Sequence, residues 1–258
     1  MLNKSFGFIG GGRVVNILLK VLSKTNKLPQ NIYVHDNNIS VLEKLQSKYP
    51  TIKTTDNNQL PAKCNYVFIS LHPPVIVSTL ESIKEEINED SIIISLAPKI
   101  SINKIKEIIN KNVKVIRLIP NAPSYIGKGY NPVVFSENFN ENEKIELMEF
   151  FNIFGSTPEV EERKLESYAL ITAMGPTYLW FQLAQLYKLG KEFNLTDEEL
   201  KDGITEMVKG CVDTLFNSGL TFNEVMDLIP VKPLSESEKT IEDIYGSNLR
   251  ALYTKLTN

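Results

Sequence analysis

Two different spacings of hydrophobic positions divide the chain into an N-terminal and a C-terminal part. In the N-terminal part, short continuous apolar runs alternate with stretches whose apolar residues recur at helical spacing. Continuous runs are typical of strands buried on both faces of a parallel sheet, and the alternation predicts a doubly wound α/β domain. The predicted strands are Phe6–Ile9, Ile32–His35, Ile52–Thr54, Tyr66–Leu71, Ile92–Leu96, Val113–Leu118 and Pro132–Phe135, and the predicted helices are Arg13–Ser23, Ile39–Lys48, Val75–Glu86 and Ile102–Asn110.

The strand pattern ends near residue 160, and helical signals follow. Thr196 and Glu199 form a capping box, and a helix with a single apolar face runs from there to Gly219. A second helix opens at Thr221 and closes at Pro230. We therefore expect two domains, an α/β domain over residues 1–160 and an all-α domain over residues 161–258.

The predicted helix over residues 176–193 has apolar side chains on nearly all sides. Such a helix is normally buried, and a small helical domain has little else with which to cover it. Two arrangements would bury it. One is packing against a second copy of the chain, and the other is packing against the α/β domain. The first favours a homodimer through the C-terminal helices and leaves a higher oligomer open.

Composition narrows the class of protein. The 258 residues are 42% hydrophobic and carry a net charge of −3, which gives no reason to expect a nucleic acid or an anionic membrane as partner. Two cysteines and two histidines at unrelated spacings suggest neither a disulfide framework nor a metal site. The first residues lack a signal-peptide pattern, and the apolar runs are too short to span a bilayer. We expect a cytoplasmic protein.

The stretch GFIGGGRVVNILLKVL, residues 7–22, carries the clearest candidate chemistry. Gly10 permits a sharp turn after the first strand, and Gly12 lets the backbone approach a pyrophosphate. The amides of Arg13 and Val14 would face that anion at the start of the next helix. Val15 stands where a third glycine is usual, which predicts a slightly larger spacing between helix and strand. The alternative is a tight α/β turn that binds nothing.

Asp36, followed by Asn37, lies at the end of the second predicted strand, where dinucleotide sites place a carboxylate on the ribose. A carboxylate accepts hydrogen bonds from a ribose 2′-hydroxyl and repels a 2′-phosphate, so Asp36 weakly favours NAD over NADP. Arg13 would offset that repulsion. The alternative role of Asp36 is that of a solvated turn residue.

The remaining strand ends also point to ligand contacts, because doubly wound sheets bind ligands at the carboxyl ends of their strands. Three segments, ISLHPP (69–74), SLAPK (95–99) and RLIPNAP (117–123), are rich in proline or polar residues. His72 is a candidate acid or hydrogen-bond donor, or simply a neutral ring that lines the cleft. Lys99 either meets a phosphate or substrate carboxylate, or is a solvated lysine. The candidate cofactor contacts in these segments are Ser70, Leu71, His72, Pro73, Ala97 and Pro120.

Taken together, the motifs resemble those of the pyrroline-5-carboxylate reductase family over most of the chain. FGFIGGGRV is similar to the glycine-rich start of that family, VIRLIPNAPSYIGKGYNPVVF to its Arg-Val-Met-Pro-Asn-Thr-Pro segment, and AMGPTYLW to its Ser-Gly-Ser-Gly-Pro-Ala-Tyr. The resemblance implies an N-terminal Rossmann domain that binds NAD(P)H and a C-terminal helical domain that dimerises by interleaving helices. It also implies that Asn57 contacts the adenosine side of the cofactor and that Asn121 lines the nicotinamide.

The chain departs from this family in one segment. The family binds its substrate with a Ser-Pro-Gly-Gly-Thr-Thr loop, whereas this chain has PVKPLSESEKT over residues 230–240. Ser235 or Ser237 falls on a threonine that lies near the imine nitrogen in the family, so both are candidate catalytic residues. Glu236 and Glu238 add negative charge where a substrate carboxylate is expected. Lys99 or Lys232 would then neutralise that carboxylate.

Three functions are compatible with these features. The first is reduction of a cyclic imine acid, pyrroline-5-carboxylate to proline, with hydride from the cofactor. The second is the same type of reaction on another imine, keto acid or redox cofactor, which the altered segment motivates. The third is a homologue that binds a dinucleotide without catalysis.

Overall fold

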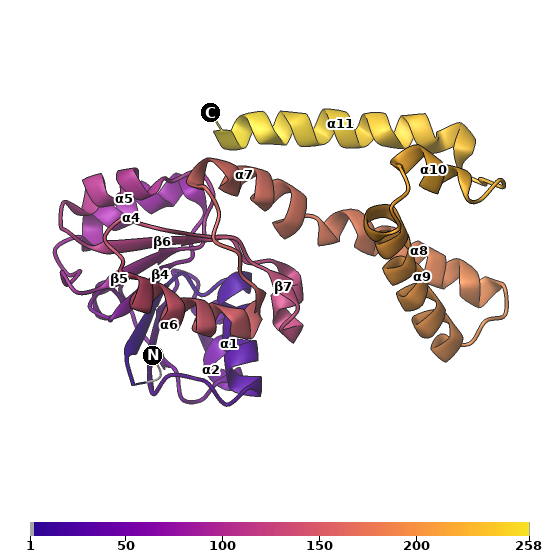
Figure 1. Ribbon diagram of the computed structural model, residues 1–258. Coiled ribbons are helices and arrows are strands. Elements are labelled where there is room, and N and C mark those ends of the chain that lie inside the picture. The colour runs from indigo at the N-terminus through magenta and orange to yellow at the C-terminus, as the bar shows by residue number, and fades with distance from the viewer. Residues whose placement is uncertain (1–2, 258) are drawn as a thin grey trace. The chain divides into compact units, whose positions relative to one another are not determined.

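The computed structural model describes residues 3–257, which form two compact units (Figure 1). The first unit runs to Met174 and takes in the last helical residues from Tyr253, and the second is Gly175–Leu252. The first unit extends past the last strand because Leu165 and Ala169 still pack in the core beside the sheet. The loss of the strand pattern at residue 160 thus marks the end of the strands, and the functional division at residues 160 and 161 stays a prediction.

Within residues 3–257, the first unit is built on a seven-stranded sheet in the order β3-β2-β1-β4-β5-β6-β8. Neighbouring strands from β3 to β6 pair in parallel, and β8 pairs antiparallel to β6. The mostly parallel, doubly wound sheet predicted from the alternating pattern is confirmed. The strands are β1 (Ser5–Ile9), β2 (Asn31–His35), β3 (Lys53–Thr54), β4 (Tyr66–Ile69), β5 (Ile92–Ser95), β6 (Lys114–Leu118) and β8 (Val133–Phe135).

Helices cover both faces of this sheet (Figure 1). Successive strand residues point to opposite faces, so Phe68 joins the core beneath α1, α2 and α6, while its neighbours Val67 and Ile69 join the core beneath α4 and α5. Burial of the strands on both faces explains their continuous apolar sequence. These helices are α1 (Arg13–Lys24), α2 (Ile39–Lys48), α3 (Gln59–Ala62), α4 (Pro73–Ile83), α5 (Ile102–Ile109) and α6 (Glu141–Phe151).

Several short elements complete the first unit. Strands β7 and β9 form a separate two-stranded parallel sheet. Helix α7 continues into a π-helical turn before Gly175. A π-helical turn is uncommon and leaves carbonyl groups that need other partners. The elements are η1 (Ala122–Ile126), β7 (Gly129–Tyr130), η2 (Asn152–Phe154), β9 (Gly155–Ser156), η3 (Glu162–Lys164), α7 (Leu165–Tyr168) and η4 (Ala169–Ala173).

The second unit is helical throughout its regular structure, as the sequence predicts. Capping boxes open α9 at Thr196 with Glu199 and α10 at Thr221 with Glu224. Gly190 of α8 lies so close to Leu200 of α9 that a Cβ atom there would stand 2.1 Å from a Leu200 methyl group. The helices are α8 (Pro176–Glu192), α9 (Asp197–Asn217), α10 (Phe222–Asp227) and α11 (Ser235–Thr257).

Most apolar side chains of the second unit are exposed. Among residues 175–252 only Gly190 and Leu200 are buried. Helices with this much apolar surface normally pack against another surface. The exposed large apolar side chains include Leu179, Trp180, Phe181, Leu186, Phe193, Met207, Val212, Phe216, Met226, Ile229, Val231 and Leu234.

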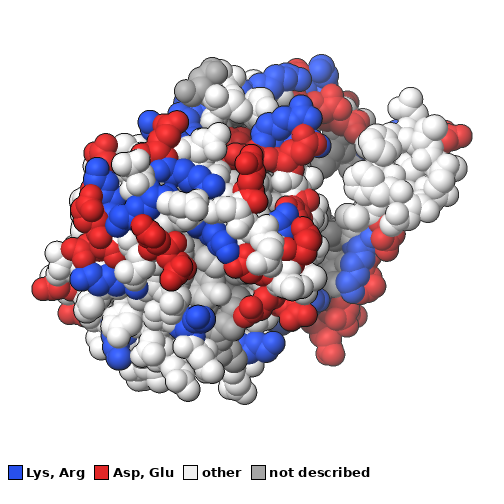
Figure 2. All heavy atoms as spheres, turned by 60° about the vertical axis from the view of Figure 1, so that its left-hand side comes forward, with Lys and Arg blue, Asp and Glu red and all other residues white. Residues whose placement is uncertain are grey.

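The surface and the cysteines agree with an ordinary globular composition. On the face shown in Figure 2, cationic and anionic side chains are interspersed rather than gathered into a field of one sign. No helix within residues 3–257 combines the length and apolarity needed to cross a membrane.

Cys64 and Cys211 are both free thiols. Burial raises the pKa of Cys64 to about 11, against a smaller lowering by a hydrogen bond with Ser5, whereas Cys211 is exposed.

Candidate active site

The residues that the sequence predicts as cofactor contacts gather at one edge of the main sheet. Parallel strands present their carboxyl ends together, and the strand order switches direction between β1 and β4, where such sheets bind ligands. The predicted contacts follow β1 (Gly10, Gly12), β2 (Asp36, Asn37), β3 (Asn57), β4 (Ser70, Leu71, His72), β5 (Ala97) and β6 (Pro120, Asn121), or begin α1 (Arg13, Val14) and α4 (Pro73).

The glycine turn after β1 has two glycines with different physical roles. Gly10 has φ of +93°, and a Cβ atom there would lie 2.6 Å from the Ser70 carbonyl oxygen, so a side chain is excluded. A Cβ atom on Gly12 would meet nothing within 4 Å. Gly12 is therefore open toward the surface, at the N-terminus of a helix that no side chain caps. Uncapped helix amides beside an open glycine suit an approaching pyrophosphate.

Two further observations fit a ligand at this edge. The hydroxyl oxygens of Ser70, after β4, and Ser95, at the end of β5, are buried without a hydrogen-bond partner. Buried hydroxyl groups are normally paired. The Ser70 backbone carbonyl lies against Gly10, so one of the two unpaired hydroxyls belongs to a residue beside the glycine turn. Val15, in place of the third glycine, is fully buried in the core.

Asp36 is held by backbone groups on both sides. One carboxylate oxygen accepts the N–H of Gly11 and the other accepts the N–H of Asn38, both at 2.8 Å. The side chain thereby joins the glycine turn to the turn that opens α2. Each carboxylate oxygen has a second lone pair, so contact with a ribose hydroxyl is compatible with both bonds.

A polar pocket of about 300 Å³ lies beside the ends of β2 and β3. Asn57 accepts the N–H of Gln59 and donates to Asp56, so its side chain is fixed in the pocket wall. The Asn58 side-chain oxygen is buried and unpaired. Asn57 thus lines a polar pocket, and its contact with the adenosine side of a cofactor stays a prediction. The lining of the pocket is His35, Asn37, Asp56, Asn57, Asn58, Gln59, Ser82 and Ile83.

Asn121 is buried, and its side-chain amide makes hydrogen bonds to other residues of the first unit. Its oxygen accepts the N–H of Tyr130, and its nitrogen donates to the Thr172 carbonyl of the π-helical turn. Asn121 thus links the segment after β6 to the last turn of the first unit. The structure gives this side chain a positioning role, and contact with a nicotinamide stays a proposal.

A buried ion-pair cluster, which the sequence did not predict, lies close to the end of β5. Arg117 on β6 is 2% exposed and donates to Glu162 at 2.9 Å and to Glu166 at 2.6 Å. Burial raises the pKa of the Glu166 carboxyl, but the hydrogen bond and the charge of Arg117 outweigh this effect, so the pKa is lowered. The available signal was an arginine within an apolar strand, since a buried guanidinium requires carboxylate partners.

The segment over residues 230–240 is only partly a loop. Helix α11 begins at Ser235, so Ser235 and Ser237 lie in its first turn together with Glu236 and Glu238. Carboxylates in a first turn stabilise a helix through its dipole, which gives these two glutamates a structural role besides any effect on a substrate. The predicted loop is corrected accordingly: its irregular part ends at Leu234.

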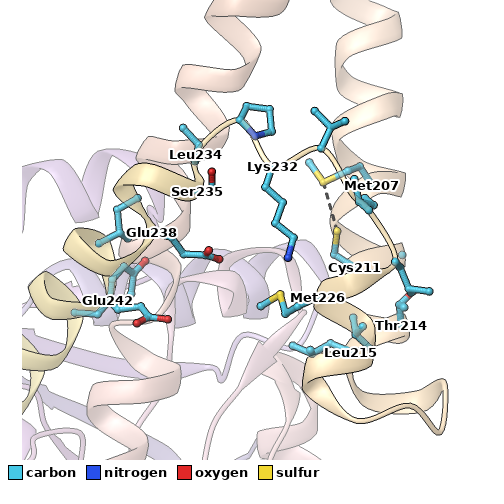
Figure 3. A pocket seen from close by; sticks show the side chains of 18 residues that line it. Met207, Cys211, Thr214, Leu215, Met226, Lys232, Leu234, Ser235, Glu238 and Glu242 are labelled. Carbon is cyan, nitrogen blue, oxygen red and sulfur yellow. Dashed lines mark hydrogen bonds between the residues drawn. The ribbon is translucent and has the colours of Figure 1, made fainter.

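An open apolar pocket of about 1130 Å³ lies within the second unit, between α9, α10 and the start of α11 (Figure 3). Lys232, Glu238 and Glu242 extend toward its centre in Figure 3. Ser235 lines this pocket, whereas Ser237 is not part of the lining. The sequence did not single out Met207, Cys211 or Glu242 as pocket residues, because they become neighbours only through the packing of three helices.

Within residues 3–257, no group of three or more His, Cys, Asp or Glu side chains is arranged to hold a metal ion.

Comparisons with known proteins agree with this arrangement. Residues 5–99 match the family described as NADP oxidoreductase coenzyme F420-dependent. The pyrroline-5-carboxylate reductase of Staphylococcus epidermidis is 28% identical over 227 residues, 87% of this chain and 84% of the relative.

Two solved structures have the same fold. The Plasmodium falciparum pyrroline carboxylate reductase with NADP bound has a TM-score of 0.80 at 23% identity, over 99% of this chain and 97% of that chain. The Streptococcus pyogenes 1-pyrroline-5-carboxylate reductase has a TM-score of 0.81 at 16% identity, over 98% of both chains. In sequence over most of its length, and in fold, this chain is similar to the pyrroline-5-carboxylate reductases.

Proposed function

We propose that the protein is an NAD(P)H-dependent reductase of a cyclic imine acid, with pyrroline-5-carboxylate as substrate and proline as product. The observation that carries this proposal is the glycine turn, open at Gly12, at the switch point of the sheet. The similarity to curated reductases over most of the chain supports the substrate. A hydride adds to the imine carbon, the nitrogen retains a proton, and the oxidised cofactor leaves.

The residues have distinct roles in this proposal. Gly12 and the amides of Arg13 and Val14 bind the pyrophosphate, Asp36 and Asn37 the ribose, and Asn57 the adenosine side. The loops with Ser70, Leu71, His72, Pro73, Ala97 and Pro120 line the remaining cofactor crevice, and Ser235 or Ser237 orients the imine. When bound, the nicotinamide supplies the hydride. A protonated imine already accepts hydride well, so the protein chiefly needs to position the reactants.

The second unit supports a further element of the proposal, a homodimer. Leu179, Trp180 and Phe181 on α8 are each more than half exposed, which is the surface that an interface between two copies would cover. The free thiols Cys64 and Cys211 suit a reducing compartment, so we place the protein in the cytoplasm.

The altered segment favours a second candidate, reduction of a different imine or keto acid. Helix α11 starts at Ser235 without the two glycines of the family loop, and Glu236 and Glu238 occupy its first turn. Two carboxylates there disfavour a substrate that presents only a carboxylate. A protein that binds the cofactor without turnover is the third possibility.

One assay separates these functions. Purified full-length protein is mixed with NADH or NADPH and pyrroline-5-carboxylate, and the absorbance of the reduced nicotinamide is followed. Oxidation that depends on the substrate supports the first function. If the protein binds NADPH in a fluorescence titration but oxidises it only with another imine or keto acid, the second function replaces the first. Binding without oxidation across the panel leaves the non-catalytic function.

A further inference from the structure

Lys99, in the loop after β5, has an uncommon backbone conformation. Its φ is +83°, in the left-handed region that non-glycine residues rarely adopt. Such strain persists only where surrounding contacts impose it, and it is concentrated at functional sites. The switch point lies between β1 and β4, and β5 belongs to the half of the sheet that starts at β4. In a doubly wound sheet, this second half faces the nicotinamide when the half with β1 and β2 binds the adenosine.

The ion-pair cluster bonds to the backbone of this segment. Glu166 accepts the backbone N–H of Lys99 at 3.1 Å while it pairs with the buried Arg117. Glu162, the second carboxylate on Arg117, accepts the N–H of Ile102 at 2.7 Å. One buried guanidinium and two carboxylates therefore hold both ends of the segment from Lys99 to Ile102.

The same contacts leave the Lys99 side chain exposed. Its ammonium makes no ion pair among the described residues, whereas the charge of Arg117 is matched by two carboxylates. In the loops directly after β4 and β5, residues 70–72 and 96–101, Lys99 is the only Lys or Arg. A strained, fixed backbone that carries the local free cation is suited to a small anion that must be held in one orientation.

We propose that Lys99 is a specificity-determining residue that binds the carboxylate of the imino-acid substrate, and that Glu166 is the residue that positions it. This inference rests on the proposed function. Lys99 would compensate for the glycine-loop amides that this chain lacks over residues 230–240. A cofactor phosphate is the other available anion, but the open glycine turn that suits a pyrophosphate lies after β1 rather than after β5.

The test uses four variants of the full-length protein. Lys99→Met removes the charge, Lys99→Arg retains it, and Lys99→Gly removes it while relieving the positive φ. Lys104→Met is the matched control, an exposed lysine on α5 outside the proposed site. Initial rates give kcat and KM for pyrroline-5-carboxylate and for the reduced cofactor. Calorimetry gives the affinity of L-proline and of pyrrolidine, which lacks the carboxylate, for the protein saturated with oxidised cofactor.

We expect Lys99→Met and Lys99→Gly to raise KM for pyrroline-5-carboxylate by about 10- to 100-fold, the usual weight of a charge-assisted hydrogen bond. Their kcat and their KM for the cofactor should stay close to wild type. L-proline should bind to them correspondingly more weakly, whereas pyrrolidine should bind to wild type and to both variants with the same affinity. Lys99→Arg should recover most of the affinity. Lys99→Gly should be no less heat-stable than wild type, which separates loss of the charge from loss of folding.

The contrary results are distinguishable. An active wild type whose Lys99→Met variant keeps its KM and its proline affinity overturns the role of Lys99 and leaves the proposed function standing. A rise in cofactor KM alone assigns Lys99 to a phosphate and overturns the substrate role. A wild type that neither reduces pyrroline-5-carboxylate nor binds L-proline overturns the proposed function, and the role of Lys99 with it.

Discussion

The carboxylate of Asp36 accepts the backbone N–H of Gly11 at 2.8 Å, so the residue expected to contact the ribose also holds the glycine turn in place. Its second oxygen bonds to the N–H of Asn38. If a ribose binds here, the charge of Asp36 sets the choice between NADH and NADPH, whereas its hydrogen bonds set the shape of the site for both.

Two substitutions at Asp36 separate these roles. Asp36→Asn removes the repulsion of a 2′-phosphate and retains one acceptor oxygen, so the ratio of kcat/KM for NADPH over NADH should rise by about tenfold, or about 1.4 kcal/mol. Asp36→Ala removes both hydrogen bonds and should weaken both cofactors. Initial rates with each cofactor give the kcat/KM ratio, and fluorescence titrations give the two affinities. An unchanged NADPH to NADH ratio in Asp36→Asn would rule out a ribose contact.

Substitutions at Gly10 and Gly12 should affect different properties, the first the stability of the fold and the second the affinity for the cofactor. Gly10→Ala places a Cβ atom against the Ser70 carbonyl at a positive φ, and it should cost more than the roughly 1–2 kcal/mol of the left-handed backbone alone. Its melting temperature should fall by several degrees. Gly12→Val, with open space around the Cβ atom, should keep the melting temperature and lose cofactor affinity. Thermal unfolding and cofactor titration of both variants check this. A Gly12→Val variant with wild-type affinity would contradict a pyrophosphate at this turn.

The Arg117 cluster should make part of the stability depend on pH. The folded-state pKa of Glu166 is lowered, so its contribution is present above the unfolded pKa of about 4.3 and is lost as pH falls through the folded pKa. Glu166→Gln should cost on the order of 3 kcal/mol at neutral pH, and its difference from wild type should shrink below about pH 4. Denaturant unfolding across pH measures the difference. Glu137→Gln, an exposed control, should show none, and a pH-independent gap for Glu166→Gln would refute the linkage.

The exposed apolar face of α8 gives a prediction about assembly. Phe181→Glu places a charge on a side chain that is 66% exposed within the structure and that a dimer would bury. We expect the protein to sediment as a dimer and the variant to sediment as a monomer, or to dissociate at a protein concentration at least about 100-fold higher than wild type. Lys20→Glu, an exposed charge reversal on α1, is the control. A wild-type monomer at all accessible concentrations would exclude this interface.

The sheet and its two helix layers were predictable because strands buried on both faces leave continuous apolar runs such as Tyr66–Ile69. Helix α6 was not predicted. Its buried residues Leu147, Phe150 and Phe151 lie near its C-terminal end, while Ile145 is exposed. Apolar residues therefore do not recur at helical spacing along the whole helix. The capping box of Asn140 with Glu143 was the available signal.

The candidate site was predictable where it follows from strand ends and not where it depends on distant partners. Gly10 and Gly12 are recognisable from the local sequence, because they lie between an apolar strand and an apolar helix at the spacing of a dinucleotide-binding turn. The bond between Gly11 and Asp36 joins residues 25 positions apart, and that between Arg117 and Glu166 joins residues 49 apart. No local pattern specifies such pairs: the first joins the turns that follow the paired strands β1 and β2, and the second joins β6 to α7.

The unequal exposure of the two thiols allows one native cysteine to be labelled selectively. Cys64 is buried with a pKa of about 11 and holds almost no thiolate at neutral pH, whereas Cys211 lines the open pocket of the second unit. A maleimide dye should therefore label a single position without any cysteine being engineered. A dye at Cys211 would follow whatever enters or covers that pocket, and the rate of its attachment would record how often the pocket is open.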